Sequence, residues 1–121
     1  MGQFATAVEK GINNAFVKWA DGFGQDIARG VTTSQIRNIF GSVKKLEMSG
    51  DVDMPQLLLL KPRIAYARQR NRGLAPLADE LTAAIDAVDA ATNPNDQQER
   101  FRRFCQGFEA ILAYHRAYGG K

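Results

Sequence analysis

The sequence is poor in the residues that build disulfides, metal sites and catalytic pairs. Among its 121 residues it has one cysteine and one histidine, so no internal disulfide can form and a reducing compartment is expected. No apolar run approaches the roughly 20 residues that span a bilayer. The first residues lack a basic segment followed by an apolar one, so we expect no secretory signal. These absences favour a cytoplasmic protein that does not contact a membrane.

The same scarcity disfavours catalysis. Cys105 and His115 lie ten positions apart, a spacing that does not place them on one helical face. The sequence has no cluster with metal-ligand spacing, no glycine-rich phosphate loop and no nucleophile elbow. We therefore expect no enzymatic activity, no catalytic residue, no metal and no cofactor. We expect His115 to make a structural or polar contact.

Helical periodicity is abundant. Five segments place apolar residues three or four positions apart, and none alternates with a period of two. The apolar stripes run from Phe4 to Trp19, Ile36 to Leu46, Leu57 to Ala67, Leu74 to Val88 and Phe101 to Leu112. They predict an all-α fold, a compact bundle of about five helices, in one domain over residues 1–121. Phe101, Phe104 and Phe108 are expected in the core, since stacking on bases would require exposure.

Short signals predict where these helices begin and end. Thr32 and Gln35 stand in the positions of a capping box, and the segment DVDMP, with its acidic residues and early proline, predicts a further helix start. Gly73 is a predicted stop. Nearer the N-terminus, Gly22 and Gly24 are expected to break or bend the first helix.

Charge is distributed by segment. The formal net charge is +3 and the pI is near 9.2. Residues 61–72 contain five cations and no acid, whereas residues 73–99 contain six acids and no cation. This alternation is typical of a protein that offers one side to a polyanion and another side to something else.

The stretch LLLLKPRIAYARQRNRG (57–73) combines a core face with cations. On a helix the apolar residues share one face, and cations flank both of its edges: Lys61, Arg68 and Arg72 on one side, Arg63 and Arg70 on the other. Pro62 is expected to kink or split the helix, because it removes an N–H and clashes with the carbonyl of residue 58. Composition alone favours arginines that solvate a surface helix, while the absence of acids at i±4 favours a bound polyanion.

A second basic face is expected within residues 31–50. Arg37, Gly41 and Lys44 share a helical face there, with Lys45 adjacent. A glycine inside a helix is destabilising by about 1 kcal/mol relative to alanine, so Gly41 is expected to have a purpose. It either leaves room for a phosphate between two cations or permits close contact with another helix, and the spacing allows both.

Three blocks of the sequence stand out together: TTSQIRNIF (32–40), LLLLKPRIAYARQR (57–70) and FRRFCQGFEAILAYHR (101–116). In this order they resemble the small subunit of the type III-A (Csm) CRISPR effector complex. The resemblance covers residues ~30–118. It leaves residues 1–30 as an N-terminal helix outside the family motifs and residues 31–118 as the core bundle.

The resemblance implies a non-catalytic subunit of a ribonucleoprotein in antiviral defence. Several copies would stack along the crRNA–target RNA duplex, so the expected partners are both RNAs, the other Csm subunits and further copies of the chain. Arg37, Lys61, Arg63 and Arg70 match basic positions of the motifs and are expected to contact the RNA backbone. Lys44, Lys45 and Arg68 are added from charge alone.

Two alternatives come from other classes of protein. The segment VTTSQIRNIF (31–40) could open the helix pair of a DNA-binding helix-turn-helix regulator, although no compact turn is followed by a polar recognition helix. A structural adaptor could instead use the same arginines to bind an acidic partner protein, with no nucleic-acid contact.

Overall fold

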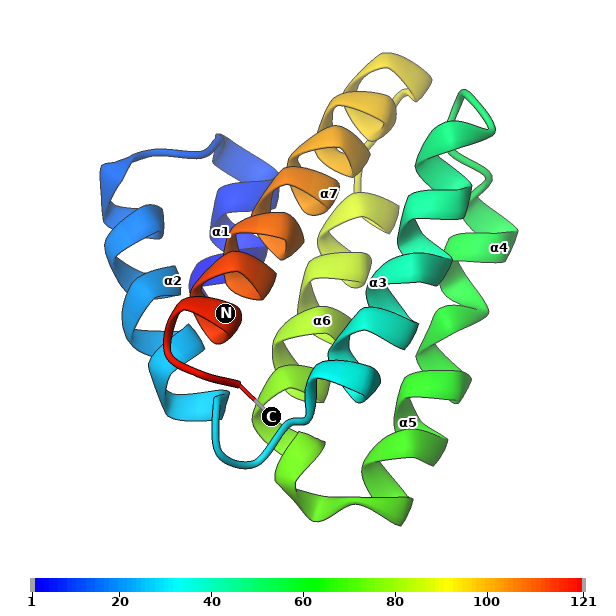
Figure 1. Ribbon diagram of the computed structural model, residues 1–121. Coiled ribbons are helices and arrows are strands. Elements are labelled where there is room, and N and C mark those ends of the chain that lie inside the picture. Colours follow the sequence, from blue (N-terminus) through cyan, green and yellow to red (C-terminus); the bar gives the residue numbers. More distant parts are fainter. Residues whose placement is uncertain (1, 121) are drawn as a thin grey trace.

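The computed structural model describes residues 2–120, and every regular element among them is helical (Figure 1). The elements are α1 (Gln3–Lys10), α2 (Asn14–Ile27), α3 (Thr33–Met48), α4 (Met54–Leu58), α5 (Leu60–Arg70), the 3-10 helix η1 (Arg72–Leu74), α6 (Ala75–Asp89) and α7 (Pro94–Ala117). The predicted all-α fold is confirmed. Within the described residues there are six helices, against about five predicted, when α4 and α5 are taken as one broken helix.

The longest helix, α7, is the centre of the bundle. It contacts α1, α2, α3 and α6, and Figure 1 shows α1 and α2 on one side of it and α3 on the other. α5 packs on α6 and lies on the side of the molecule away from α2. α3 and α5 are therefore the outer helices on that side.

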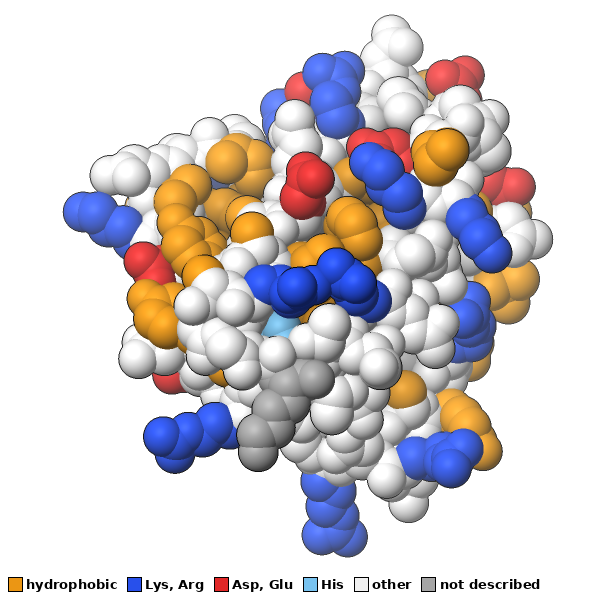
Figure 2. All heavy atoms as spheres, in the orientation of Figure 1, with side chains coloured by type: hydrophobic (Ala, Val, Ile, Leu, Met, Phe, Trp, Pro, Cys, Tyr) orange, Lys and Arg blue, Asp and Glu red, His pale blue; other side chains and the backbone are white. Residues whose placement is uncertain are grey.

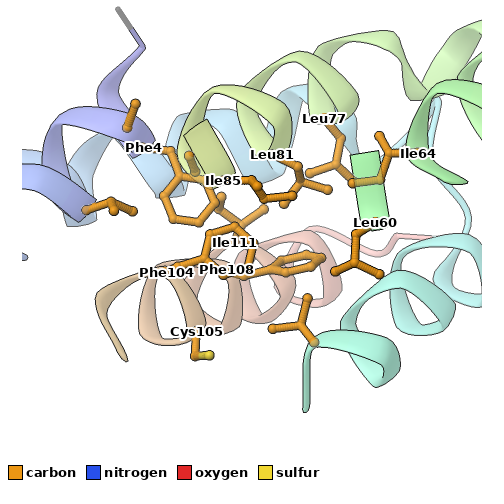
Figure 3. Packing of buried hydrophobic residues seen from close by; sticks show 14 of the residues in the cluster. Phe4, Leu60, Ile64, Leu77, Leu81, Ile85, Phe104, Cys105, Phe108 and Ile111 are labelled. Carbon is orange, nitrogen blue, oxygen red and sulfur yellow. The ribbon is translucent and has the colours of Figure 1, made fainter. Parts of the chain in front are cut away.

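Aromatic residues of α1 and α7 form the middle of the core (Figure 3). Phe4 is stacked on Phe104 with 5.5 Å between ring centroids, and Phe104 lies 6.3 Å from Phe108. Phe101, Phe104 and Phe108 are at most 1% exposed, which confirms their assignment to the core. Leucine and isoleucine side chains of α5 reach the same cluster from the opposite side (Figure 3).

Two helix starts agree with the sequence signals. The capping box of α3 is complete, because the Gln35 N–H donates to Thr32 Oγ1 at 3.1 Å and the Thr32 N–H donates to Gln35 Oε1 at 2.9 Å. Asp53 caps α4 by accepting from the N–H of Gln56 at 3.2 Å. These contacts satisfy backbone donors that a helix start leaves without a partner.

The N-terminal helix breaks at a different place from the one predicted. α1 ends at Gly11, whose φ of 120° is readily adopted only by glycine, and Asn13 caps α2. α2 then continues through Gly22 and Gly24, so the predicted break at these glycines is wrong. Gly24 instead permits close packing on α7, because a Cβ there would lie 2.5 Å from the Cβ of Tyr114.

The predicted split of the basic segment occurs at Leu59. Pro62 has no N–H to donate to the carbonyl of Leu58, and the chain forms the short α4 before α5 begins. Leu57 and Leu60 are buried, whereas Leu59 is 55% exposed. The core face of this segment is therefore confirmed for the first and last of the four leucines.

α5 ends earlier than the glycine signal indicated. The last helical residue is Arg70, because Asn71 turns extended with φ −141° and its side chain accepts from the N–H of Gly73 at 3.1 Å. Gly73 lies inside η1, where a Cβ would be 2.4 Å from the carbonyl oxygen of Gly30. This glycine allows the α5–α6 connection to pass against the α2–α3 connection.

Candidate nucleic-acid interface

The cations of α5 lie on two edges, as its helical spacing predicted, and the two edges face different helices. Lys61 and Arg68 point to α6, and Arg63 and Arg70 point to α3. Figure 2 shows Lys and Arg side chains on the part of the surface where α3 and α5 lie, with few acidic side chains between them.

On the α6 edge the cations already have partners. Lys61 Nζ lies 2.6 Å from Asp86 Oδ1, and Arg68 Nη1 lies 2.5 Å from Asp79 Oδ1. All four side chains are between about a third and two thirds exposed, so each pair contributes about 0–1 kcal/mol to stability. The pairs nevertheless cancel the charge that these two predicted RNA contacts would offer to a phosphate.

The spacing of the acidic residues could have predicted the partners of Lys61 and Arg68 from the sequence. We expected these cations to have no acidic partner because no acid lies at i±4 on the same helix. Lys61 and Arg68 are seven positions apart, and so are Asp79 and Asp86 on the next helix. Two antiparallel helices with matched seven-residue spacing bring such residues together in reversed order, as α5 and α6 do.

The opposite edge of α5 borders a groove against α3. We call it the α3–α5 groove and define it by Asn38, Ser42 and Lys45 of α3 and Arg63, Tyr66 and Arg70 of α5. Its middle is a hollow of about 450 Å³ with an apolar floor that includes Ile39 and Ile64. Two further hollows share lining residues with it, one at the end of the groove that Lys45 lines and one at the end that Arg70 lines. Of the residues that the structure describes, no Asp or Glu lines any of these three hollows.

One aromatic side chain stands beside the groove with most of its surface in solvent. Tyr66 is 64% exposed, and the Arg70 guanidinium carbon lies 5.8 Å from the centroid of its ring. This distance is within the range of a cation–π contact. Tyr66 and Arg70 are thereby held next to each other on the groove wall.

Arg37 and Lys44 lie on the other edge of α3 from the groove. Lys44 Nζ lies 2.9 Å from Glu47 Oε1, and this hydrogen bond is the main cause that raises the pKa of Lys44. A Cβ on Gly41 would meet no atom within 4 Å. The proposal that Gly41 permits close contact with another helix is therefore wrong within this chain, and room for a phosphate remains as its predicted purpose.

The seven predicted RNA contacts thus fall into three groups. Lys45, Arg63 and Arg70 border the α3–α5 groove; Lys61 and Arg68 pair with α6; Arg37 and Lys44 flank Gly41 on the outer edge of α3. Arg63 and Arg70 come from a different helix than Lys45, so the groove brings together cations that sequence spacing had treated separately. Asn38, Ser42 and Tyr66 were not predicted as part of any site.

The reactive side chains form no common centre. His115 is fully buried and its Nε2 lies 2.6 Å from the Val31 carbonyl oxygen, which confirms the predicted structural contact. Cys105 is 4% exposed, and burial raises the pKa of its thiol to about 12. Within residues 2–120 no three His, Cys, Asp or Glu side chains gather as metal ligands, and no helix is long and apolar enough to cross a membrane.

The fold and this surface define a small all-helical protein with a basic face between α3 and α5. Residues 11–121 match the family model described as Csm2 Type III-A. The chain belongs to that family, the small subunit of the type III-A Csm complex, and the resemblance drawn from the three motifs is confirmed. The match includes residues 11–30, and with them α2, which those motifs left out. No curated protein and no solved structure matches the chain.

Proposed function

We propose that this chain is a non-catalytic small subunit that lines the crRNA–target RNA duplex of a type III-A effector and contacts the phosphate backbone. Several copies lie along the duplex beside the other Csm subunits and take part in antiviral defence. The observation that carries the proposal is the α3–α5 groove, whose cations have no carboxylate beside them within residues 2–120. Such a surface favours a polyanion over a protein of mixed charge.

Phosphate contacts suit this role because they are indifferent to sequence. In an RNA-guided complex, base pairing between guide and target reads the sequence, and the protein needs to hold only the backbone and shape of the duplex. Arg63 and Arg70 supply the main contacts in this proposal, with Lys45 at the end of the groove. Arg37 and Lys44 form a second contact across Gly41, while Lys61 and Arg68 reach RNA only if their pairs with α6 open.

The family assignment argues against the alternative of a DNA-binding helix-turn-helix regulator. The helix that residues 31–40 open, α3, continues to Met48, and the next helix is the five-residue α4, whose sequence MPQLL offers no polar recognition face. The remaining alternative is a structural adaptor, and an experiment must distinguish it from an RNA-binding subunit. It would use the same arginines on an acidic protein surface.

Co-purification from a host that contains the other Csm subunits tests the proposal. A tagged chain is expected to bring down the other subunits together with crRNA, and the recovered complex should bind target RNA in a salt-dependent way. An Arg63→Ala, Arg70→Ala chain should recover the same subunits but bind target RNA more weakly. Recovery of subunits with unchanged target binding by this variant would support the adaptor instead.

A further inference from the structure

We propose that the α3–α5 groove holds an unpaired nucleotide of the RNA, with the base against Tyr66 and the phosphate on Arg63 or Arg70. This inference rests on the function proposed above and names the ligand of the same surface more closely. A surface that bound only the phosphates of a duplex would need cations alone. This groove also has a hollow, an apolar floor and an exposed aromatic ring.

The exposed ring is the first argument. Tyr66 is 64% exposed although the rings of Phe101, Phe104 and Phe108 are buried, so its ring is not part of the core. Aromatic rings that bind single-stranded nucleic acids are exposed in this way, because a base must reach their face. Arg70 lies 5.8 Å over the Tyr66 ring, where its guanidinium can pair with the phosphate of a nucleotide stacked beside it.

The shape and chemistry of the hollow are the second argument. Its volume of about 450 Å³ lies in the range of roughly 300–1,000 Å³ typical of sites for small organic molecules. Ile39, Ile64 and Ala67 offer the apolar surface that a base needs. Asn38 and Ser42 line the same hollow and can donate and accept hydrogen bonds at a base edge.

The charge around the hollow is the third argument, and it selects nucleic acid over a protein segment. Arg63 borders the middle of the groove, and Lys45 and Arg70 border its two ends. An apolar helix from a partner protein would leave these cations without counter-charges, whereas a nucleotide places a phosphate next to its base. The neighbouring hollow between α5 and α6 lacks this property, because Asp79 and Asp86 line it together with Lys61 and Arg68.

Fluorescence titration of the full chain with two RNA duplexes tests the inference. One duplex is fully paired, and the other carries a single bulged nucleotide whose base is a fluorescent adenine analogue. Low salt brings weak phosphate contacts into the measurable range. We expect tighter binding of the bulged duplex and a change of its fluorescence as the base stacks.

Substitutions of Tyr66 give the decisive comparison. Tyr66→Ala should weaken binding of the bulged duplex by about fivefold or more and abolish the fluorescence change, while the paired duplex changes by less than about twofold. Tyr66→Phe should behave as the unsubstituted chain, because stacking uses the ring and not the hydroxyl. Tyr118→Ala is the matched control, since Tyr118 is 44% exposed at the end of α7 and bonds Asp21 instead of lining the groove.

Five results would overturn the inference. Tyr66→Ala could weaken both duplexes equally, which makes Tyr66 a general contact, or weaken neither. It could change the number of copies that associate in sedimentation while RNA binding stays constant, which makes the groove a protein interface. If the unsubstituted chain binds neither duplex, and Arg63→Ala with Arg70→Ala leaves target RNA binding by the reconstituted complex unchanged, the proposed function fails as well. If paired RNA binds and is weakened by Arg63→Ala with Arg70→Ala, but the bulged duplex binds no more tightly than the paired one, only the nucleotide site is lost.

Discussion

The two edges of α5 have the same cation spacing but opposite surroundings. Lys61 and Arg68 meet Asp86 and Asp79 across the α5–α6 contact. Arg63 and Arg70, also seven positions apart, meet amide, hydroxyl and apolar groups across the groove to α3. The difference shows that formal charge along a sequence does not measure the charge available to a ligand. The residues on the neighbouring helix decide it.

The free energy of binding a phosphate should also differ between the two edges of α5. A phosphate that approaches Arg63 meets a solvated cation and releases counterions, which is the main source of non-specific affinity for nucleic acid. A phosphate that approaches Lys61 must first separate it from Asp86 or share it with that carboxylate. The exposed pair itself contributes only about 0–1 kcal/mol, but the remaining carboxylate repels the phosphate at close range.

The largest effect is expected from Arg63→Ala with Arg70→Ala. In a reconstituted complex this pair should weaken target RNA binding about tenfold or more near physiological salt, because two phosphate contacts are lost. The slope of log affinity against log salt should fall by about 1–2 units. Both residues lie off the buried face of α5, so the circular dichroism spectrum and thermal midpoint should stay close to those of the unsubstituted chain.

Lys61→Ala with Arg68→Ala is the matched partner of that experiment. It removes the same number of cations from the same helix, but we expect a loss of less than about threefold, because these charges are already paired. Equal losses from the two double variants would break the comparison between the edges and place the RNA over both of them. Titration of each complex with target RNA across a salt series distinguishes the two results.

Removing the two carboxylates that pair with Lys61 and Arg68 should make the α6 edge of α5 bind RNA more as the α3 edge does. Asp79→Asn with Asp86→Asn frees Lys61 and Arg68, and we expect target RNA affinity to rise about threefold with a steeper salt slope. Asp89→Asn is the control, because Asp89 lies on the same helix without pairing either of these cations. A loss of affinity in the double variant would mean that the acidic helix itself faces the nucleic acid.

A moderate loss is expected from Arg37→Ala with Lys44→Ala, about threefold, with a shallower salt slope. Glu47 Oε1 lies 2.9 Å from Lys44 Nζ and offsets part of its positive charge, so this pair should matter less than Arg63 with Arg70. Retention of crRNA should be affected less than retention of target RNA. Quantifying both RNAs in the purified complex measures this, and an unchanged target affinity would remove the outer edge of α3 from the interface.

The smallest effect concerns Gly41. Because a Cβ at this position meets no atom within 4 Å, Gly41→Ala should stabilise the free chain by about 0.5–1 kcal/mol. It should also weaken target RNA binding about twofold by filling the space between Arg37 and Lys44. Thermal unfolding and RNA titration measure the two effects separately. A stabilised variant with unchanged RNA binding would leave Gly41 without a role in the interface.

Local signals in the sequence were sufficient for most of the fold. Thr32 with Gln35, Asp53 and Pro62 each act on groups within four residues, and the structure shows the expected cap or break at or beside each. The glycines in α2 were misread because their effect depends on a distant partner. Gly24 serves the contact with Tyr114 on α7, and neither a propensity nor a turn signal contains that information.

The candidate site was also predictable only where it depends on a single helix. Helical spacing separated Arg63 and Arg70 from Lys61 and Arg68 correctly, since it is a property of one helix. The groove required knowledge of how far α3 stands from α5. That distance follows from how each packs: α3 on α7, where Phe40 meets Phe108 edge to face, and α5 on α6. No single segment of the sequence encodes it.

The break at Leu59 gives the groove two ends with different local stability. α4 has only five residues, so it can open without disrupting α5, and local opening of this kind has a small free energy where few backbone bonds are involved. Gln56 and Leu59 border the hollow at the Lys45 end, whereas the hollow at the Arg70 end is lined by residues of the longer helices α3 and α5. Amide hydrogens of α4 should therefore exchange with solvent faster than those of α5. A strand held in the groove would have fixed anchors at Lys45 on α3 and Arg63 on α5, and an adjustable wall at Gln56 and Leu59, which lets one subunit follow small changes in the pitch of the nucleic acid.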